Sequence, residues 1–117
     1  ISLHEGEHPD KRAIETAENH GIKIGKQRSR PITKKDLEDF DKIYCMDISV
    51  YEDVISIAKN EEQREKISLF LEEAEIPENN YEVFDPYWSG LDGFEKVYQL
   101  LDQASESIKT KLLNHQI

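Results

Sequence analysis

The sequence predicts a three-layer α/β fold in which helices cover both faces of a central parallel sheet. Two short apolar runs have the length of buried strands, residues 42–46 and 66–71, and helical patterns lie before, between and after them. Strands that alternate with helices are typical of parallel sheets, because each connection must cross a face of the sheet. Two strands alone would leave apolar faces uncovered, so we expect further strands from residues beyond these 117 or from another chain.

The first predicted helix begins at Pro9 and ends before Gly21. Proline is favoured at the first helical position, Asp10 suits the positive end of the helix dipole, and glycine is favoured just past a helix end. The loop that follows carries Arg28 and Arg30. These arginines either lie in solvent, or one of them supports a catalytic loop or an anionic substrate.

Three capping patterns predict where later helices begin. Thr33 opens a short helix with Phe40 on its buried side, Ser49 opens a helix that continues to about residue 58, and Asp92 marks the last helix, which runs to about residue 113. The last helix should bury one apolar face at helical spacing. That face comprises Phe94, Val97, Tyr98, Leu101, Ile108 and Leu112.

Composition favours a single acidic domain over residues 1–117. The net charge is −10, which opposes general binding to nucleic acid or to an anionic membrane surface. No apolar run approaches the roughly 20 residues that a membrane-spanning helix needs. One cysteine excludes an intrachain disulfide. We therefore expect a cytoplasmic protein that binds neither nucleic acid nor membrane.

Asp85 is the strongest candidate for a catalytic group. It opens the run Asp85-Pro86-Tyr87-Trp88 in the loop before the last helix. Consecutive aromatic side chains in a loop do not both enter a core easily, so at least one should be exposed or line a cleft. A carboxyl group beside such rings loses hydration, which raises its pKa and lets it donate a proton near neutral pH. The alternative is structural, because Asp-Pro commonly starts a turn.

Cys45 is the one candidate thiol nucleophile, and its surroundings oppose that role. A phosphate-transfer cysteine needs a loop of backbone amides and an arginine six positions later, where this chain has Tyr51. We expect a buried structural thiol instead.

Asp47 follows the same strand, at the end of the sheet where parallel sheets place ligands, although a plain helix-entry role is equally open. No metal or cofactor is expected, because the histidines lack metal-ligand spacing: His4, His8, His20 and His115.

Five segments together resemble the low-molecular-weight protein tyrosine phosphatases, in that family's order and near its spacing. They are HEGEHPDKR at 4–12, HGI at 20–22, RSRPIT at 28–33, FDKIYCMDIS at 40–49 and DPYWSG at 85–90. The resemblance implies a four-stranded parallel sheet and makes this chain the C-terminal three quarters of such a domain. It implies hydrolysis of an aryl phosphomonoester through a phosphocysteine intermediate, with the nucleophilic cysteine and its phosphate-binding arginine upstream of Ile1.

The resemblance also implies roles for individual residues. Asp85 would protonate the leaving phenolate and later activate water. Tyr87 and Trp88 would line the entrance beside the substrate ring, and Leu3 stands where the family often has an aromatic on the opposite wall. The implied substrate is a phosphotyrosine protein or another aryl phosphate, bound by a monomer or weak homodimer. Two further residues fall in the region that supports the catalytic loop: Asp47 and Arg30.

Two other functions stay open on the same fold. A phosphoarginine phosphatase or an arsenate reductase would use a similar loop, but thioredoxin-coupled arsenate reductases need further downstream cysteines, and this chain has one. A truncated or degenerate binding module would need no catalytic equipment. A Cys-x5-Arg motif upstream would decide for the enzyme, whereas an initiator methionine directly before Ile1 would decide for the binding module.

Overall fold

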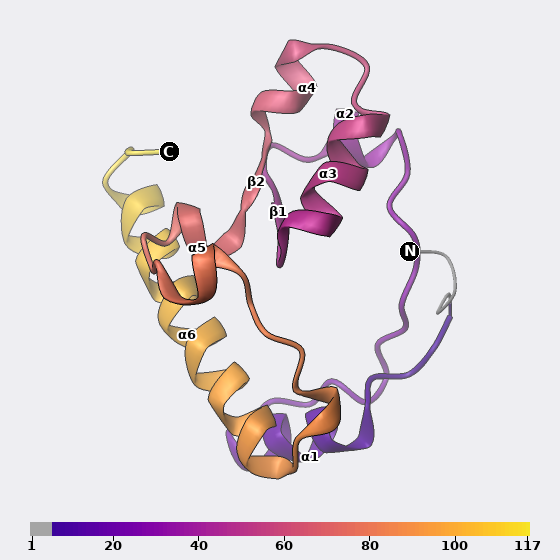
Figure 1. Cartoon of the computed structure of the whole chain (residues 1–117), viewed down its shortest axis with the longest axis vertical. Helices are drawn as coiled ribbons and strands as arrows, with labels where there is room; N and C mark the ends of the chain where they lie inside the picture. The colour runs from indigo at the N-terminus through magenta and orange to yellow at the C-terminus, as the bar shows by residue number, and fades with distance from the viewer. Residues whose placement is uncertain (1–5) are drawn as a thin grey trace. The chain divides into compact units, whose positions relative to one another are not determined.

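Helices and a short parallel sheet make up the fold, as predicted. The computed structural model describes residues 6–117, which divide into two compact units. The first contains the chain up to Ile32 with Asp85–Gln99, and the second contains Thr33–Phe84 with Leu100–Ile117. The elements, in chain order in Figure 1, are α1 (Lys11–Asn19), α2 (Asp36–Asp39), β1 (Ile43–Cys45), α3 (Ile48–Ile57), α4 (Glu61–Glu65), β2 (Ile67–Leu69), α5 (Phe70–Glu73), η1 (Glu78–Tyr81), η2 (Pro86–Trp88) and α6 (Leu91–Leu113).

The two strands of the second unit pair in parallel, which confirms the predicted sheet type. Helix α3 packs on both strands and α5 contacts β2; Figure 1 shows α3 next to the strands and α5 directly after β2. The expected strand over 66–71 is too long, because Phe70 and Leu71 turn into α5, where Leu71 is fully buried. The register joins three residue pairs: Ile43 with Ile67, Tyr44 with Ser68, and Cys45 with Leu69.

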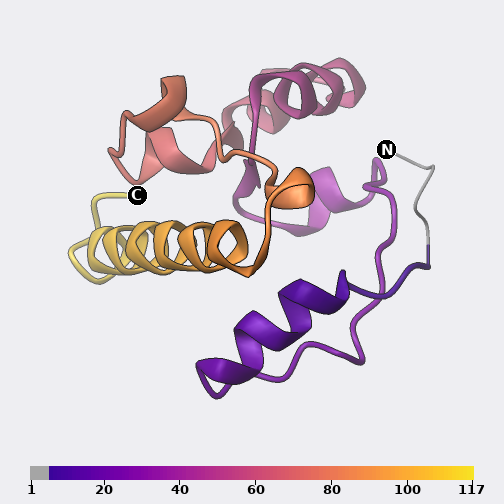
Figure 2. The same ribbon diagram turned by 60° about the horizontal axis from the view of Figure 1, so that its bottom comes forward.

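The core of the second unit forms between α5, the loop after it and the C-terminal half of α6. The α6 side chains in this core recur at helical spacing, so they form one buried stripe. Figure 2 shows α5 against the C-terminal half of α6. Removing such side chains from water is the main favourable term in folding this unit. Six buried residues make up the core: Leu71, Ala74, Ile76, Leu100, Ala104 and Ile108.

Two aspartates cap helices at positions that differ from the predicted ones. Asp10 lies before α1 and not in its first turn, and its side chain accepts a hydrogen bond from the Arg12 N–H. Asp47, and not Ser49, caps α3 by accepting from the Val50 N–H at 2.8 Å. In both cases the carboxylate satisfies an amide that has no partner within its own helix.

The predicted end of α1 is confirmed, whereas the N-cap of α2 is Lys35 and not Thr33, although the Thr33–Asp36 bonds expected from the sequence are present. Thr33 and Asp36 bond reciprocally: the Thr33 N–H donates to Asp36 Oδ2 at 2.9 Å, and the Asp36 N–H donates to Thr33 Oγ1 at 3.3 Å. Gly21 follows the last residues of α1 with a φ of 79°, a left-handed conformation that favours glycine.

Three expectations about helix starts and burial are wrong. Helix α6 begins at Leu91, so Asp92 lies inside its first turn and not at its cap. Phe40 is 51% exposed and Leu112 is 53% exposed, although both were expected to be buried. Glu61–Glu65 form α4, a helix that the sequence patterns did not predict, and its cap Asn60 accepts from the Gln63 N–H.

Within residues 6–117, no helix combines the length and the apolar character needed to cross a bilayer.

Candidate active site

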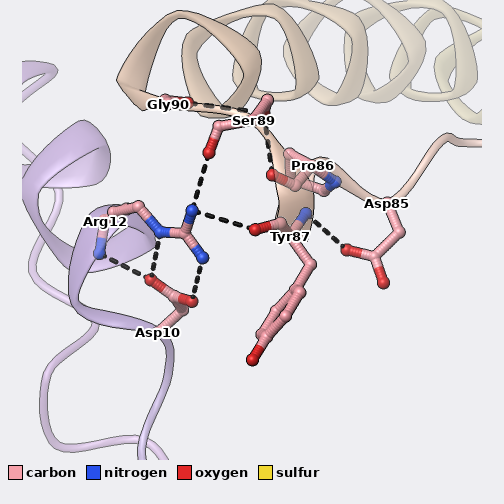
Figure 3. Close-up of polar contacts among 7 residues, drawn as sticks. All are labelled: Asp10, Arg12, Asp85, Pro86, Tyr87, Ser89 and Gly90. Atoms are coloured by element: carbon pink, nitrogen blue, oxygen red, sulfur yellow. Dashed lines mark hydrogen bonds and ion pairs between the residues drawn. The ribbon is translucent and has the colours of Figure 1, made fainter.

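The segment from Asp85 to Gly90 folds into a turn held by its own polar groups (Figure 3). Asp85 caps η2, because its Oδ1 accepts a hydrogen bond from the Tyr87 N–H at 2.9 Å. Pro86 takes the first helical position, where the missing N–H costs no bond. The Ser89 hydroxyl donates to the Pro86 carbonyl at 2.7 Å. These bonds fix the Asp85 carboxyl group at the start of a well-defined turn.

Both aromatic side chains of this turn are exposed, as predicted for at least one of them. Tyr87 is 55% exposed and Trp88 is 93% exposed. The two rings meet edge to face with their centroids 4.9 Å apart. Asp85 is itself exposed. The expected shielding of its carboxyl group is therefore wrong within the described residues, because the two rings pack against each other.

Arg12 connects helix α1 to the same turn. Its Nη1 donates to the Tyr87 carbonyl at 3.0 Å and to the Ser89 carbonyl at 2.7 Å. Its Nε and Nη2 donate to the two oxygens of Asp10 at 3.1 Å and 2.9 Å. Its Cζ lies 4.5 Å from the centroid of the Phe94 ring. Figure 3 shows the guanidinium group between the carboxylate and the turn.

The Arg12–Asp10 pair stabilises the charged form of both groups. Hydrogen bonds from the Arg12 side chain and backbone lower the pKa of Asp10, and the bond to Asp10 raises the pKa of Arg12. About a third of each side chain is exposed, 32% and 33%, so solvent screens much of the attraction. The pair therefore matters more for orientation than for stability, because the carboxylate orients the planar guanidinium group of the arginine.

His20 attaches the other end of α1 to α6. Its Nε2 lies 2.8 Å and 2.9 Å from the two carboxylate oxygens of Glu95. Its ring stacks on Tyr98 with a centroid separation of 3.8 Å. Hydrogen bonds from Gln99 and then His20 lower the pKa of Glu95. On sequence alone, His20 was considered only as a metal ligand, whereas the structure gives it a carboxylate partner.

Cys45 and Asp47 belong to the second unit, at the carboxyl end of β1. Cys45 is 2% exposed, and burial raises the pKa of its thiol, which confirms the predicted buried cysteine. Asp47 caps α3 through Val50, so the helix-entry role is confirmed. The Val83 N–H donates to the Met46 carbonyl at 2.8 Å. This bond joins the loop after η1 to the end of β1 within the second unit.

The remaining predicted site residues lie at the N-terminal side of the chain. Arg30 belongs to the first unit, and its Nη1 donates to the Pro31 carbonyl at 3.2 Å. Ser29, beside it, donates its N–H to the Glu7 carbonyl at 3.0 Å. Leu3 lies outside the described residues. In the part of the chain that the structure describes, no three potential metal ligands converge.

Arg12 is the residue of this site that sequence patterns did not predict. Its acceptors in the turn are backbone carbonyls 75 and 77 positions away. Every residue has such a carbonyl, so the sequence does not show which ones will accept a bond. One signal was present: Asp10 and Arg12 stand two positions apart at a helix start, a spacing that lets a capping carboxylate reach a side chain as well as an amide.

The sequence of the whole chain matches one protein family. Residues 1–116 match the family described as low molecular weight phosphotyrosine protein phosphatase. A low molecular weight phosphotyrosine protein phosphatase of Schizosaccharomyces pombe is 35% identical over 108 residues, which cover 92% of this chain and 67% of the relative. The chain therefore belongs to the low molecular weight phosphotyrosine protein phosphatase family.

Solved structures support the same assignment. A protein tyrosine phosphatase from Entamoeba histolytica, with Hepes in its active site, matches 100% of this chain and 73% of its own, with a TM-score of 0.89 and 29% identity. Wzb from Vibrio vulnificus, in complex with benzylphosphonate, matches 92% of this chain and 70% of its own, with a TM-score of 0.77 and 27% identity. The chain has the fold of these phosphatases.

Proposed function

We propose that this chain carries the general acid and the substrate-entrance residues of a protein tyrosine phosphatase that works through a phosphocysteine intermediate. One observation carries the proposal: a turn fixes the Asp85 carboxyl group next to two exposed aromatic side chains, Tyr87 and Trp88. A proton donor assists the departure of a phenolate, and an aromatic wall favours binding of the ring of an aryl phosphate.

Asp85 would act twice in the reaction. It first delivers a proton to the phenolate oxygen as the P–O bond breaks, so that a neutral phenol leaves. The resulting carboxylate then takes a proton from the water that attacks phosphocysteine, which releases phosphate and restores the acid. Because Asp85 is exposed in the structure, a departing oxygen can reach its carboxyl group directly.

Tyr87 and Trp88 would bind the ring of the substrate. Aromatic pairs gain from offset or edge-to-face contact beyond the burial of area, and these two rings already present an exposed edge-to-face pair. The benzylphosphonate complex of Wzb supports the choice, since that ligand combines an aromatic ring with a phosphonate.

We place the nucleophilic thiol and its phosphate-binding arginine in a segment that precedes Ile1. Cys45 does not suit the role, because it is buried, its thiol pKa is raised, and Tyr51 stands six positions later. Asp47 and Arg30 would support the phosphate-binding loop. The substrate would then be a phosphotyrosine protein or a smaller aryl phosphate.

The Asp85→Asn variant of the full-length protein tests the acid role. Asparagine retains an acceptor for the Tyr87 N–H, so the turn is kept while the transferable proton is lost. We expect kcat for phenyl phosphate to fall by about 10²- to 10⁴-fold, with the Kd of benzylphosphonate unchanged. The kcat/KM of activated 2,4-dinitrophenyl phosphate, which reports the phosphorylation step alone, should fall far less than that of phenyl phosphate, because its leaving group departs without protonation.

The matched control is Asp92→Asn, an exposed carboxylate in the first turn of α6, which should leave kcat unchanged. Unaltered phenyl phosphate turnover in Asp85→Asn would refute the acid assignment. If the unsubstituted full-length protein binds benzylphosphonate without hydrolysing either ester, the binding module is the correct function instead.

A further inference from the structure

We propose that Arg12 is a positioning residue for proton transfer by Asp85, and that Asp10 orients Arg12 for this purpose. The proposal rests on the acid role of Asp85 set out above and extends it to residues on a different element of the chain. Arg12 would not touch the substrate; it would act through the backbone of the turn that holds the carboxyl group.

The connection passes through a single residue, Tyr87. The Tyr87 N–H donates to Asp85 Oδ1 at 2.9 Å, and the Tyr87 carbonyl accepts from Arg12 Nη1 at 3.0 Å. Both polar groups of one main-chain residue are thus engaged, one by the acid and one by the arginine. A movement of this backbone after loss of Arg12 would displace the Asp85 carboxyl group with it (Figure 3).

The second carbonyl fixes the direction of the turn. Arg12 Nη1 also donates to the Ser89 carbonyl at 2.7 Å, so the guanidinium group binds the chain on both sides of Trp88. Two attachment points resist rotation of the segment between them, whereas one would act as a pivot. The side chain of Trp88 is 93% exposed, and its own packing therefore does little to hold the segment.

Asp10 and Phe94 hold the guanidinium group in place. The Asp10 carboxylate accepts from Nε and Nη2, and it is itself fixed to α1 by the Arg12 N–H. The buried Phe94 ring lies 4.5 Å from Cζ. A lysine would keep the charge, but its N–H donors all lie on one nitrogen, so it would not reproduce this planar arrangement.

Arg12 is not needed simply to attach α1 to α6. His20 at the other end of α1 makes that attachment, by bonding to Glu95 and stacking on Tyr98. The bonds of Arg12 go to the turn that precedes α6, and this is why we assign it to the acid and not to general stability.

The test compares two esters in the full-length protein and uses the ratio of their kcat/KM values, phenyl phosphate over 2,4-dinitrophenyl phosphate, because kcat/KM reports the phosphorylation step and not the hydrolysis of phosphocysteine that both esters share. A displaced acid slows the ester that needs protonation and spares the one that does not. Arg12→Ala should lower kcat/KM for phenyl phosphate about 10- to 100-fold, lower that of the activated ester far less and leave the Kd of benzylphosphonate unchanged. Arg12→Lys should lie close to Arg12→Ala, and added guanidinium ion should partly restore the ratio in Arg12→Ala.

Asp10→Asn separates the orienting role from helix capping. Asparagine remains a good N-cap, so α1 is retained while the charged fork partner of Arg12 is lost. The ratio should fall to a value between those of the parent and Arg12→Ala. The matched control is Arg64→Ala, which removes an arginine paired with Glu61 on α4 at 3.1 Å and should leave the ratio unchanged.

Combination with Asp85→Asn distinguishes failure of this proposal from failure of the acid role. If Arg12 acts through Asp85, adding Arg12→Ala to Asp85→Asn leaves the ratio where Asp85→Asn alone put it. A shifted ratio in Asp85→Asn with an unshifted ratio in Arg12→Ala and Arg12→Lys overturns the role of Arg12 alone. An unshifted ratio in Asp85→Asn overturns both roles.

If Arg12→Ala does not fold, Arg12→Lys supplies the same comparison, with circular dichroism confirming its fold.

Discussion

The Ser89 side chain occupies the space that a side chain on Gly93 would need. A Cβ added at Gly93 would lie 1.7 Å from Ser89 Oγ and 2.5 Å from Ser89 Cβ. Because the Ser89 hydroxyl also donates to the Pro86 carbonyl, it cannot move away without breaking the turn. Gly93 is therefore required for close packing of the Asp85 turn on the first turn of α6.

Replacing Gly93 by alanine should destabilise this unit and impair catalysis together. Alanine in a helix is normally better than glycine by about 1 kcal/mol, so a loss of stability would show that the clash outweighs helix propensity. The measurements are thermal unfolding and kcat for phenyl phosphate. Gly25→Ala is the control, because a Cβ there meets nothing within 4 Å. Adding Ser89→Gly to Gly93→Ala should recover part of the stability; no recovery would contradict the assigned clash.

Removing the indole of Trp88 should weaken ligand binding without destabilising the fold. Its side chain is 93% exposed, and exposed substitutions usually change stability by less than about 0.5 kcal/mol. Loss of one aromatic contact should weaken benzylphosphonate about 2- to 10-fold, measured by calorimetry. Leu113→Ala, at a 70% exposed position on α6, should leave binding unchanged. A clear fall in melting temperature for Trp88→Ala would instead indicate a packing role.

Acidification should remove the stabilisation that Glu95 supplies. Its pKa is lowered in the folded protein by hydrogen bonds from Gln99 and His20, so the carboxylate contributes fully above its unfolded pKa of about 4.3 and loses that contribution as the pH falls through the folded value. Glu95→Gln should therefore flatten the fall of melting temperature with decreasing pH in this range. Identical slopes for the variant and the parent would contradict the link.

Cys45 should be dispensable for turnover. The thiol is 2% exposed and burial raises its pKa, so little thiolate forms in the folded protein. Cys45→Ala should cost on the order of 1 kcal/mol of stability and retain kcat. Alkylation of Cys45 by iodoacetamide, followed by peptide mass spectrometry, should become fast only in denaturant. Loss of all turnover in a folded Cys45→Ala protein would restore this cysteine as a nucleophile candidate.

The elements that the sequence predicted well are those whose signals are local. Gly21 ends α1 with a positive φ, and Thr33 and Asp36 form the expected reciprocal bonds. Cys45 lies buried in a parallel strand, as the apolar run around it indicated. For Gly21 and for Thr33 with Asp36, neighbouring residues supply both the pattern and the bonding partners, so the sequence contains the whole interaction. Cys45 pairs with the distant Leu69, and only its apolar run is local.

The features that were missed depend on distant partners. Leu71 belongs to a helix and not to a strand, because packing with α6 overrides the local apolar run. Tyr87 and Trp88 were expected to shield Asp85, but sequence order does not show which way two adjacent rings turn. Arg12 was overlooked because its acceptors in the turn are main-chain atoms far along the chain.

The hydrogen bond between the Tyr87 N–H and Asp85 Oδ1 makes the two oxygens of that carboxyl group inequivalent. Oδ1 is occupied as an acceptor, so a bound hydrogen resides on Oδ2, and the C=O character concentrates on the oxygen that faces the amide. The neutral Asp85 carboxyl group should accordingly give one infrared C=O stretching band, at the lowered frequency of a carbonyl oxygen that accepts one hydrogen bond. It should release its proton from Oδ2.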